Sequence, residues 1–291
     1  TIVVDNGSKD DSLPFLRRAY PEVAVISLPA NYGFAQANNI GIRRARGELI
    51  FLLNNDAAPA PDCLEVLVKA MAAHPEASFC APCMVFSHEP TILDSAGDGF
   101  SRSGTAFKRG HLEAAEDFGS DKWVFGACGG AALYRRSMLE DTGLLDEAYF
   151  LVHEDSDLNL RAQMMNHRCL YAAAAKVFHQ CNATLSTYSA AYVYFTQRNA
   201  ERLFFKNLPA TLIWKMLLPH LLYNVLGFFY FAARGKGLVF LQAKWDFLRS
   251  LGELRKSRKR IQSMIRVDPW TLYRTFEKHW VKAHVRGKVR L

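Results

Sequence analysis

Cysteine is scarce in this sequence, with six among 291 residues. Cys80 and Cys83 form one CxxC pair, and no second pair follows at the spacing of a zinc finger. This argues against a zinc-finger protein and favours reduced thiols over a metal or redox role. Glycine and proline are also limited, at 18 and 11 residues, while half of the residues are hydrophobic. The composition excludes a mainly disordered chain and predicts that most of it buries a core.

The sequence also lacks a leading methionine, a charged leader and any internal repeat. Residues 1–4 already have the apolar, β-branched pattern that ends a buried strand. We therefore expect the chain to begin inside its first domain, without the first strand of that domain. Its length suffices for one large α/β domain with an appendage, or for two modest domains.

The net charge of +8 is unevenly placed. From residue 234 onward there are sixteen Lys and Arg and four Asp and Glu, a net charge of +12. The first 233 residues carry the remaining −4. A slightly acidic body with a basic tail predicts an anionic partner for the tail, which can be a membrane surface or a nucleic acid.

Strand-like and helix-like segments alternate along the first two thirds of the chain. This alternation predicts an α/β fold with a mostly parallel sheet and helices on both faces. The sequence becomes strongly apolar at 208–233 and then basic, with a helical pattern, at 234–260. We expect one domain at 1–207 and a helical region at 208–291. The expected strands are 2–4, 23–28, 49–53, 78–86, 123–134, 169–173 and 176–179, the expected helices are 34–46 and 155–166, and a Gly/Ser-rich β-excursion or loop occupies 94–110.

Asp56 follows directly after the apolar strand at 49–53. Ligands of open parallel sheets bind at the carboxyl ends of the strands, so this carboxylate would project into the binding crevice. Mg²⁺ and Mn²⁺ are hard cations that take oxygen ligands and bridge to phosphates. An Asx turn before Pro59 explains the same residue equally well.

Glu154 and Asp155 stand together at the expected start of a helix. Adjacent acids there often only complement the helix dipole. Alternatively, one carboxylate deprotonates an attacking hydroxyl while its neighbour helps to hold the acceptor. His179 ends an apolar strand, where a histidine is more often a core or surface residue than a ligand.

Five motifs in order resemble the family 2 glycosyltransferases of the GT-A fold, and the resemblance covers residues 1–208. A sixth segment, 194–208 with Arg198 and Asn199, resembles the end of the domain in the rhamnosyltransferase-like branch. The five motifs are DNGSKDDS from Asp5, NYGFAQANNIG from Asn31, LLNND ending at Asp56, HEDSDL from His153, and the spacing of His179.

The resemblance implies a role for each candidate residue. Asp56 would bind a divalent metal, Mg²⁺ or Mn²⁺, that bridges the donor diphosphate, with His179 as a second ligand. Asp155 would be the general base, and Glu154 would help to hold the acceptor. Asp5 would contact the nucleobase or ribose, and Gly129 and Gly130, on a strand edge, would let backbone approach the donor sugar or the acceptor. The expected nucleotide-sugar site comprises Asp5, Asn31, Gly33, Asn38, Asn55, Gly129 and Gly130. The sequence departs from the family pattern at Asn54, where the first acid of the metal motif would stand.

The implied function is an inverting glycosyltransferase of cell-surface polysaccharide synthesis. It would move a sugar, with a deoxyhexose as the first choice, from a nucleotide diphosphate-sugar to a hydroxyl of a glycan or polyprenyl-linked acceptor. The alternative is a catalytically degenerate GT-A domain that acts as a membrane-bound binding or scaffold protein. Nucleic acid is not the expected partner, because the basic tail follows an apolar segment instead of an aromatic stacking platform.

Residues 208–233 are long enough to span a membrane. However, Lys215, His220 and Asn224 interrupt the apolar run, and Pro219 would break a straight helix. An apolar segment beside a polybasic one is the pattern of an interfacial anchor. We therefore expect peripheral attachment to an anionic membrane surface on the cytoplasmic face, with a packed helical appendage as the alternative.

Overall fold

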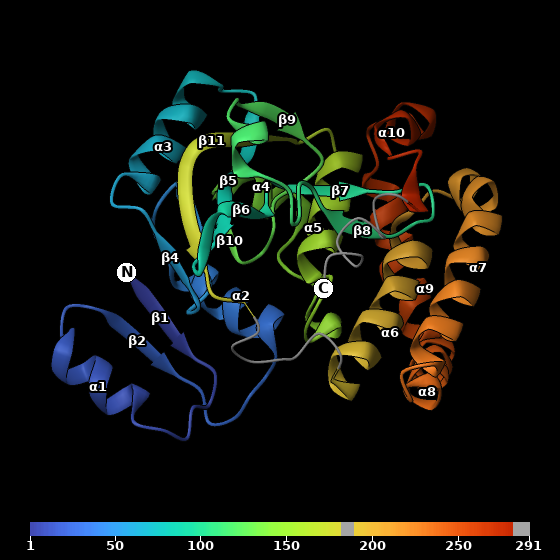
Figure 1. Cartoon of the computed structure of the whole chain (residues 1–291), viewed down its shortest axis with the longest axis horizontal. Coiled ribbons are helices and arrows are strands. Elements are labelled where there is room, and N and C mark those ends of the chain that lie inside the picture. Colours follow the sequence, from blue (N-terminus) through green and yellow to red (C-terminus); the bar gives the residue numbers. More distant parts are fainter. Residues whose placement is uncertain (182–188, 282–291) are drawn as a thin grey trace.

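A computed structural model describes residues 1–181 and 189–281 (Figure 1). Its centre is a seven-stranded sheet in the order β3-β10-β5-β11-β4, with β6 paired to β5 and β9 paired to β11. The strands of this sheet are β3 (Leu49–Leu53), β4 (Ala57–Pro59), β5 (Ala77–Phe86), β6 (Glu89–Ser95), β9 (Lys122–Val124), β10 (Ala131–Arg135) and β11 (Arg168–His179).

Two separate pairs of strands accompany this sheet, one parallel and one antiparallel. Strands β1 (Ile2–Asp5) and β2 (Ala24–Ser27) pair in parallel, joined by α1 (Ser12–Ala19). Helix α2 (Phe34–Arg44) follows β2 and packs on β1. Strands β7 (Asp98–Phe100) and β8 (Ala106–Lys108) form an antiparallel hairpin, so the Gly/Ser-rich stretch is a β-excursion.

The prediction of a mostly parallel sheet is wrong for the seven-stranded sheet. Its one parallel pairing is β5 with β11, and the other five pairings of described strands are antiparallel. Strands β3, β5 and β11 share one direction, but β10 runs the other way between β3 and β5. The alternation of strand-like and helix-like segments indicates which residues form strands. It does not indicate the direction in which each strand runs through the sheet.

Two expected strand boundaries also change. The segment expected as one strand at 123–134 forms two strands, β9 and β10, with an irregular turn at 125–130 between them. Its small residues leave little side chain to hold a continuous strand in register. The two strands expected at 169–173 and 176–179 are instead the single strand β11, with a register shift between Ala172 and Lys176.

Helices cover both faces of the sheet (Figure 1). Successive side chains of strand β5 point to opposite faces of the sheet, and both faces are buried. On one face, Leu67 of α3 (Cys63–Ala73) packs with Cys80. On the other, Leu158 packs in a cluster with Phe79 and Tyr134, whose rings stack at 5.8 Å. This second face carries α4 (Arg136–Thr142), the 3₁₀ turns η1 (Ala115–Phe118) and η2 (Glu147–Tyr149), and α5 (Glu154–Met164).

The rest of the described chain is helical. A shared apolar cluster joins Leu160 of α5 to Phe204 of α6 and Leu212 of α7, so these helices pack on the outer side of α5. Residues 208–209 separate α6 from α7. Within the described ranges, α7 is the one helix with the length and mean hydropathy (1.3) to cross a membrane. The five helices are α6 (Ala190–Asn207), α7 (Ala210–Ala232), α8 (Gly237–Arg249), α9 (Leu251–Met264) and α10 (Pro269–Thr275).

Candidate active site

Strand pairing brings Asp56 to His179. His179 ends β11 opposite Ala57 of β4, and Asp56 is the residue just before β4. The backbone N–H of Gln180 donates to the carbonyl of Asp56 at 2.9 Å, which continues the ladder past the strand ends. The His179 Nε2 consequently lies 3.3 Å from the Asp56 Oδ1. The two residues expected to share a metal are therefore neighbours, 123 positions apart in the chain.

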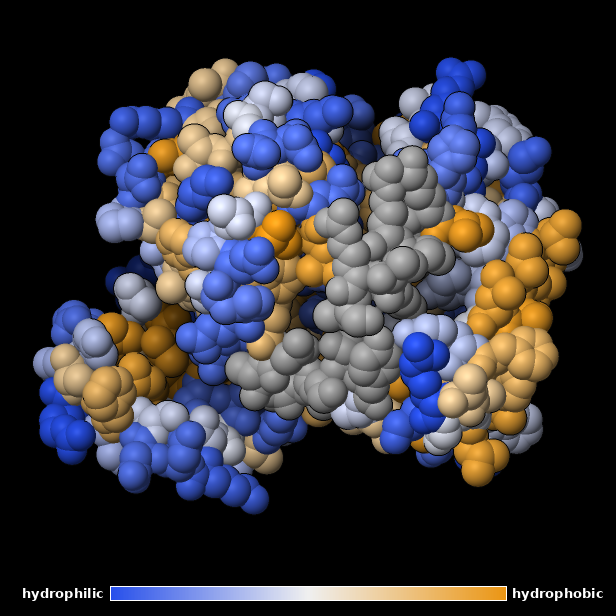
Figure 2. Space-filling model, in the orientation of Figure 1, coloured by the Kyte–Doolittle hydropathy of each residue, from blue (hydrophilic) through white to orange (hydrophobic). Residues whose placement is uncertain are grey.

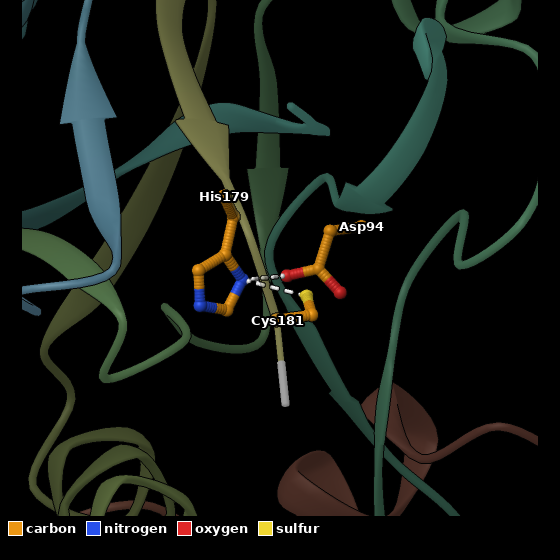
Figure 3. A group of neighbouring side chains, drawn as sticks. All are labelled: Asp94, His179 and Cys181. Atoms are coloured by element: carbon orange, nitrogen blue, oxygen red, sulfur yellow. Dashed lines mark hydrogen bonds and ion pairs between the residues drawn. The ribbon is translucent and has the colours of Figure 1, made fainter. Parts of the chain in front are cut away.

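The other side of the His179 ring faces a buried carboxylate that the sequence did not reveal. Nδ1 of His179 lies 2.8 Å from Oδ2 of Asp94 and 3.0 Å from Sγ of Cys181 (Figure 3). Burial alone would lower the pKa of His179. The hydrogen bonds and negative charge of Asp94 and Cys181 outweigh it and raise this pKa to about 10.

Lys108 neutralises Asp94. Its Nζ donates to both carboxylate oxygens, at 2.7 and 2.9 Å. Burial disfavours the charged form of Asp94, but Lys108, His111 and His179 more than offset this and hold the pKa of Asp94 well below its usual range. Asp94 is thus an ionised acceptor, and the His179 Nδ1 carries the proton between them.

The geometry identifies the side of His179 that suits a metal. Asp94, His179 and Cys181 place three ligand atoms within 4.8 Å of one another. The ammonium of Lys108 already occupies both oxygens of Asp94, however, and would repel a second cation there. The Oδ1 of Asp56 is buried and has no hydrogen-bond partner among the described residues. A hard cation between this oxygen and Nε2 of His179 fits the residues present, once that nitrogen has lost its proton.

The turn before β10 holds the Asp155 carboxylate. The backbone N–H of Gly129 donates to Oδ2 of Asp155 at 2.8 Å, and the N–H of Ser156 donates to Oδ1 at 2.6 Å. A Cβ on Gly129 would lie 3.1 Å from the Cβ of Asp155, so any larger residue would press on the side chain of Asp155. The prediction that Gly129 and Gly130 lie on a strand edge is wrong, because both lie in the turn before β10. Gly129 contacts the expected base directly.

Gly130 links this turn to the end of β3. Its carbonyl accepts the backbone N–H of Asn54 at 2.9 Å, two residues before Asp56. The expected base and the expected metal ligand are therefore tied to each other through the backbone of two consecutive glycines.

Glu154 is 5% exposed, and its Oε2 has no hydrogen-bond partner within residues 1–181 and 189–281. Burial, and then the charge of Asp155, raises the pKa of Glu154 well above its usual range. Burial thus favours the protonated form of Glu154, which can donate a hydrogen bond, while two backbone N–H groups orient the carboxyl group of Asp155.

The residues expected on the nucleotide side gather around β1 and the start of α2. Asp5 is buried, and its Oδ1 accepts the N–H of Ser8 at 3.2 Å, while its Oδ2 has no partner in the part of the chain that the structure describes. Asn31 accepts the N–H of Gly33 at 2.8 Å. Gly33 has φ +85°, and a Cβ there would collide with the carbonyl of Phe150.

Two other members of the expected nucleotide site lie differently. The amide of Asn38 donates to the carbonyl of Phe34 within its own helix, at 2.9 Å. Asn55 is exposed in the turn after β3. None of the hydrogen bonds described for Asp5, Asn31, Asn38 or Asn55 reaches the Asp56–His179 pair.

Comparison with known proteins identifies the class. The family model described as glycosyl transferase family 2 matches residues 1–143. An N-acetylglucosaminyl-diphospho-decaprenol L-rhamnosyltransferase of Mycobacterium tuberculosis is 26% identical over 207 residues, which cover 61% of this chain and 65% of that protein. O-antigen biosynthesis protein RfbC of Myxococcus xanthus is 25% identical over 63% of this chain and 15% of its own length.

A solved mannosyltransferase of Pyrobaculum calidifontis, in complex with GDP-Man and Mn²⁺, has a TM-score of 0.51 at 16% identity, covering 99% of this chain and 77% of that one. This likeness confirms the expected GT-A fold. Residues 1–143 thus match glycosyl transferase family 2, and the chain resembles the rhamnosyltransferases. It spans 65% of the length of the rhamnosyltransferase that it matches.

Proposed function

We propose that this protein is an inverting, metal-dependent glycosyltransferase of cell-surface polysaccharide synthesis. It would transfer a sugar from a nucleotide diphosphate-sugar to a hydroxyl of a glycan or polyprenyl-linked acceptor. The match of residues 1–143 to the family 2 glycosyltransferases supports the reaction class. The names of the relatives support a lipid-linked acceptor and a deoxyhexose donor as the first to be tried.

The observation that carries the proposal is the backbone link from Asp155 to the end of β3, where Asp56 follows. Gly129 donates to Asp155, and Gly130 accepts from Asn54, close to Asp56. A proton acceptor is thereby fixed beside the place where the donor diphosphate would bind. Sugar transfer needs both groups at one anomeric carbon.

The residues divide the reaction between them. A divalent cation held by Asp56 and His179 would supply charge neutralisation at the leaving diphosphate. Asp155 accepts the proton of the acceptor hydroxyl. At the same time, the hydroxyl oxygen bonds to the anomeric carbon, and the bond from that carbon to the diphosphate oxygen breaks. Glu154, protonated and buried, donates a hydrogen bond that holds the acceptor. A single displacement of this kind inverts the anomeric centre.

The nucleotide half of the donor is assigned to the β1 and α2 side. The free Oδ2 of Asp5 is a buried acceptor for a ribose hydroxyl or a nucleobase N–H. Asn31, Gly33 and Asn38 shape the start of α2, whose N–H groups suit an anion. Asn55 is exposed beside Asp56 and free to reach the donor.

The test is transfer of a radiolabelled sugar from nucleoside diphosphate rhamnose to a polyprenyl diphosphate N-acetylglucosamine. Mn²⁺ or Mg²⁺ should be required, and Asp56→Ala should abolish transfer as excess EDTA does. Asp155→Asn should lower kcat about 10²–10⁴-fold, as expected for a lost general base, with donor binding retained. Full activity in EDTA contradicts the metal assignment. A collapse of donor affinity with normal kcat contradicts the assignment of Asp155 as base.

We further propose that residues 1–207 form the transferase domain and that 208–291 attach it to the cytoplasmic face of a membrane. Trp214 and Leu218 of α7 are 76% and 77% exposed, and Leu238 of α8 is 84% exposed. Figure 2 shows hydrophobic residues gathered along the edge formed by these helices. The docking surface, as defined here, comprises Trp214, Leu218, Leu221, Leu222, Val225, Leu226 and Phe229 of α7 and Leu238, Leu241, Trp245 and Leu248 of α8.

Exposed basic residues accompany the docking surface. Lys215 lies beside Trp214, Arg234 follows α7, and Arg249 ends α8. Each basic residue near an anionic bilayer contributes about 1 kcal/mol of attraction. The docking surface, apolar and bordered by basic residues, is the kind of surface that binds an anionic lipid bilayer.

A further inference from the structure

The segment that leads into α5 has an unusual backbone. Phe150, Val152 and His153 have φ of +61°, +66° and +73°, in the left-handed region that residues other than glycine rarely adopt. Val152 is β-branched, for which this region is a clear outlier. Glu154 and Asp155 follow at once, so this backbone sets the direction in which both carboxyl groups point. Such a conformation persists only where the surroundings hold it.

Asn199 of α6 holds this segment. It is completely buried, and its Nδ2 lies 2.9 Å from the carbonyl of Tyr149, 2.8 Å from that of Leu151 and 2.8 Å from that of Val152. Three carbonyl groups can point at one place because the left-handed residues turn them there. The two N–H groups of this one amide are therefore shared among three buried carbonyls that the turn brings together.

Arg198 fixes the orientation of that amide. Its Nε donates to Oδ1 of Asn199 at 3.0 Å, so the NH₂ end faces the segment. Its Nη2 donates to the carbonyls of Ala148 and Tyr149 at 3.0 and 3.1 Å. The adjacent Arg and Asn thus act on the same turn as a unit.

The same segment touches the donor side of the site. The carbonyl of Phe150 accepts the N–H of Phe34, the first residue of α2, at 2.6 Å. The ring of Phe150 stacks on Phe195 of α6 at 5.2 Å. Further along α6, Asn207 donates to Asp157 in the first turn of α5 at 2.7 Å. Helix α6 therefore contacts both the segment before Asp155 and the turn after it.

We propose that Asn199, oriented by Arg198, is a positioning residue of the transfer reaction. It holds residues 148–153 in their left-handed path and so fixes where Glu154 and Asp155 stand relative to the donor. The part of this inference that concerns transfer rests on the proposed function; the part that concerns the backbone does not. Asn199 touches no reacting atom and acts through the backbone alone.

The test compares Asn199→Ala and Asn199→Asp with Gln197→Ala. Gln197 is a buried amide on the same helix whose Oε1 has no partner within the described residues, and it makes no described side-chain contact with 148–153. Hydrogen exchange of the peptide covering 148–157 should accelerate at least about tenfold in both Asn199 variants and stay unchanged in Gln197→Ala. Arg198→Ala, at a partly exposed position, should give a smaller acceleration and serves if the Asn199 variants do not fold.

Kinetics then separate positioning from general stability. The Asn199 variants should lose about 10–100-fold in kcat while the donor KM changes less than about threefold, as expected when a catalytic group is misplaced by about 1 Å. Unchanged exchange at 148–157 would overturn the inference whether or not the protein transfers sugar. Faster exchange with normal kcat would overturn the positioning role. Absence of transfer by the wild-type protein would instead count against the proposed function.

Discussion

Asp94 lies 2.8 Å from Nδ1 of His179, on the side of the ring opposite Asp56. This contact fixes the tautomer and tilt of the imidazole so that Nε2 faces Asp56. A carboxylate behind a metal-binding histidine is a common support in metal sites, and its loss costs about 10–100-fold in metal affinity. Lys108 keeps Asp94 ionised and unavailable as a direct ligand.

Asp94→Asn should therefore weaken Mn²⁺ binding about 10–100-fold, measured by calorimetry or by the electron paramagnetic resonance of free Mn²⁺. Asp141→Asn is the matched control, because Asp141 also bonds a histidine, His167, at 2.8 Å but lies outside the site. Equal Mn²⁺ affinity in Asp94→Asn and wild type would show that His179 needs no support. A loss in Cys181→Ser but not in Asp56→Ala would place the cation on the other side of His179.

Gly129→Ala should misplace the base without removing it. The added methyl would meet the Cβ and Oδ2 of Asp155 at 3.1 and 3.2 Å, tighter than ordinary contact. We expect kcat to fall about tenfold, less than in Asp155→Asn. Gly252→Ala is the control, because a Cβ at Gly252 meets nothing within 4 Å and alanine favours its helix. Normal turnover of Gly129→Ala would mean that the turn does not orient Asp155.

Glu201 should give the C-terminal helices an acid-sensitive link. It lies 3.1 Å from Nε2 of His220 and 2.6 Å from Nζ of Lys244, joining α6, α7 and α8. Burial alone would raise the pKa of Glu201, but the hydrogen bond from His220 and the charge of Lys244 outweigh it and lower this pKa to about 2. Because the folded pKa is below the ordinary 4.5, this stabilisation is complete above pH 4.5 and is lost as the pH falls through 2.

Glu201→Gln should accordingly reduce the free energy of unfolding in urea at pH 7 by about 3 kcal/mol. The difference from wild type should shrink steadily between pH 4.5 and 2. Glu253→Gln, at an exposed position of α9, should change stability little at any pH. A constant difference across this range would mean that the carboxylate contributes through packing and not through charge.

Replacing Trp214 and Leu218 together by serine should release the protein from vesicles that contain anionic lipid. Burying each side chain in the bilayer contributes about 2 kcal/mol, or about 4 kcal/mol for the two, so the partition coefficient should fall by up to about 10³-fold. Leu64→Ser removes an equally apolar side chain from α3, outside the docking surface, and should leave binding unchanged. High salt should also weaken binding.

Fractionation of cells separates the possible modes of attachment. Release of the protein by alkaline carbonate supports attachment at the interface. Retention through carbonate would mean that α7 spans the bilayer. A wholly soluble protein would leave α7 and α8 as a packed appendage.

The sequence alone was sufficient to place the local candidate residues on the elements where the structure has them. Asp56 follows a short apolar strand, and Glu154 and Asp155 begin a helix, so each is visible in a window of about ten residues. Asp94 is not, because its partner His179 is 85 positions away and the stretch around Asp94 has no clear period. The antiparallel course of β10 was missed for a related reason. Strand direction depends on how a long excursion returns to the sheet, which no local pattern records.

The hydrogen-bond partners of Asn199 also could not be predicted from the sequence. The segment 194–208 resembles a family motif, so the sequence singles out Asn199. However, no pattern within this segment indicates that three carbonyl groups of a turn fifty positions earlier lie against its amide. Hydrogen-bond satisfaction is a property of the folded chain, so the partner of a buried amide becomes clear only when the neighbouring backbone is known.

Helix α6 is bonded on one side to the turn before Asp155 and on the other to α8, where Tyr194 donates to Asp246 at 2.9 Å and Glu201 accepts from Lys244. A single helix, about 10 Å thick, thus connects α8 with the turn before the proposed base. With α8 resting on a bilayer, helix α6 would set the height of Asp155 above the lipid. The height of an acceptor hydroxyl above the lipid would then contribute to its selection, in addition to the identity of its sugar.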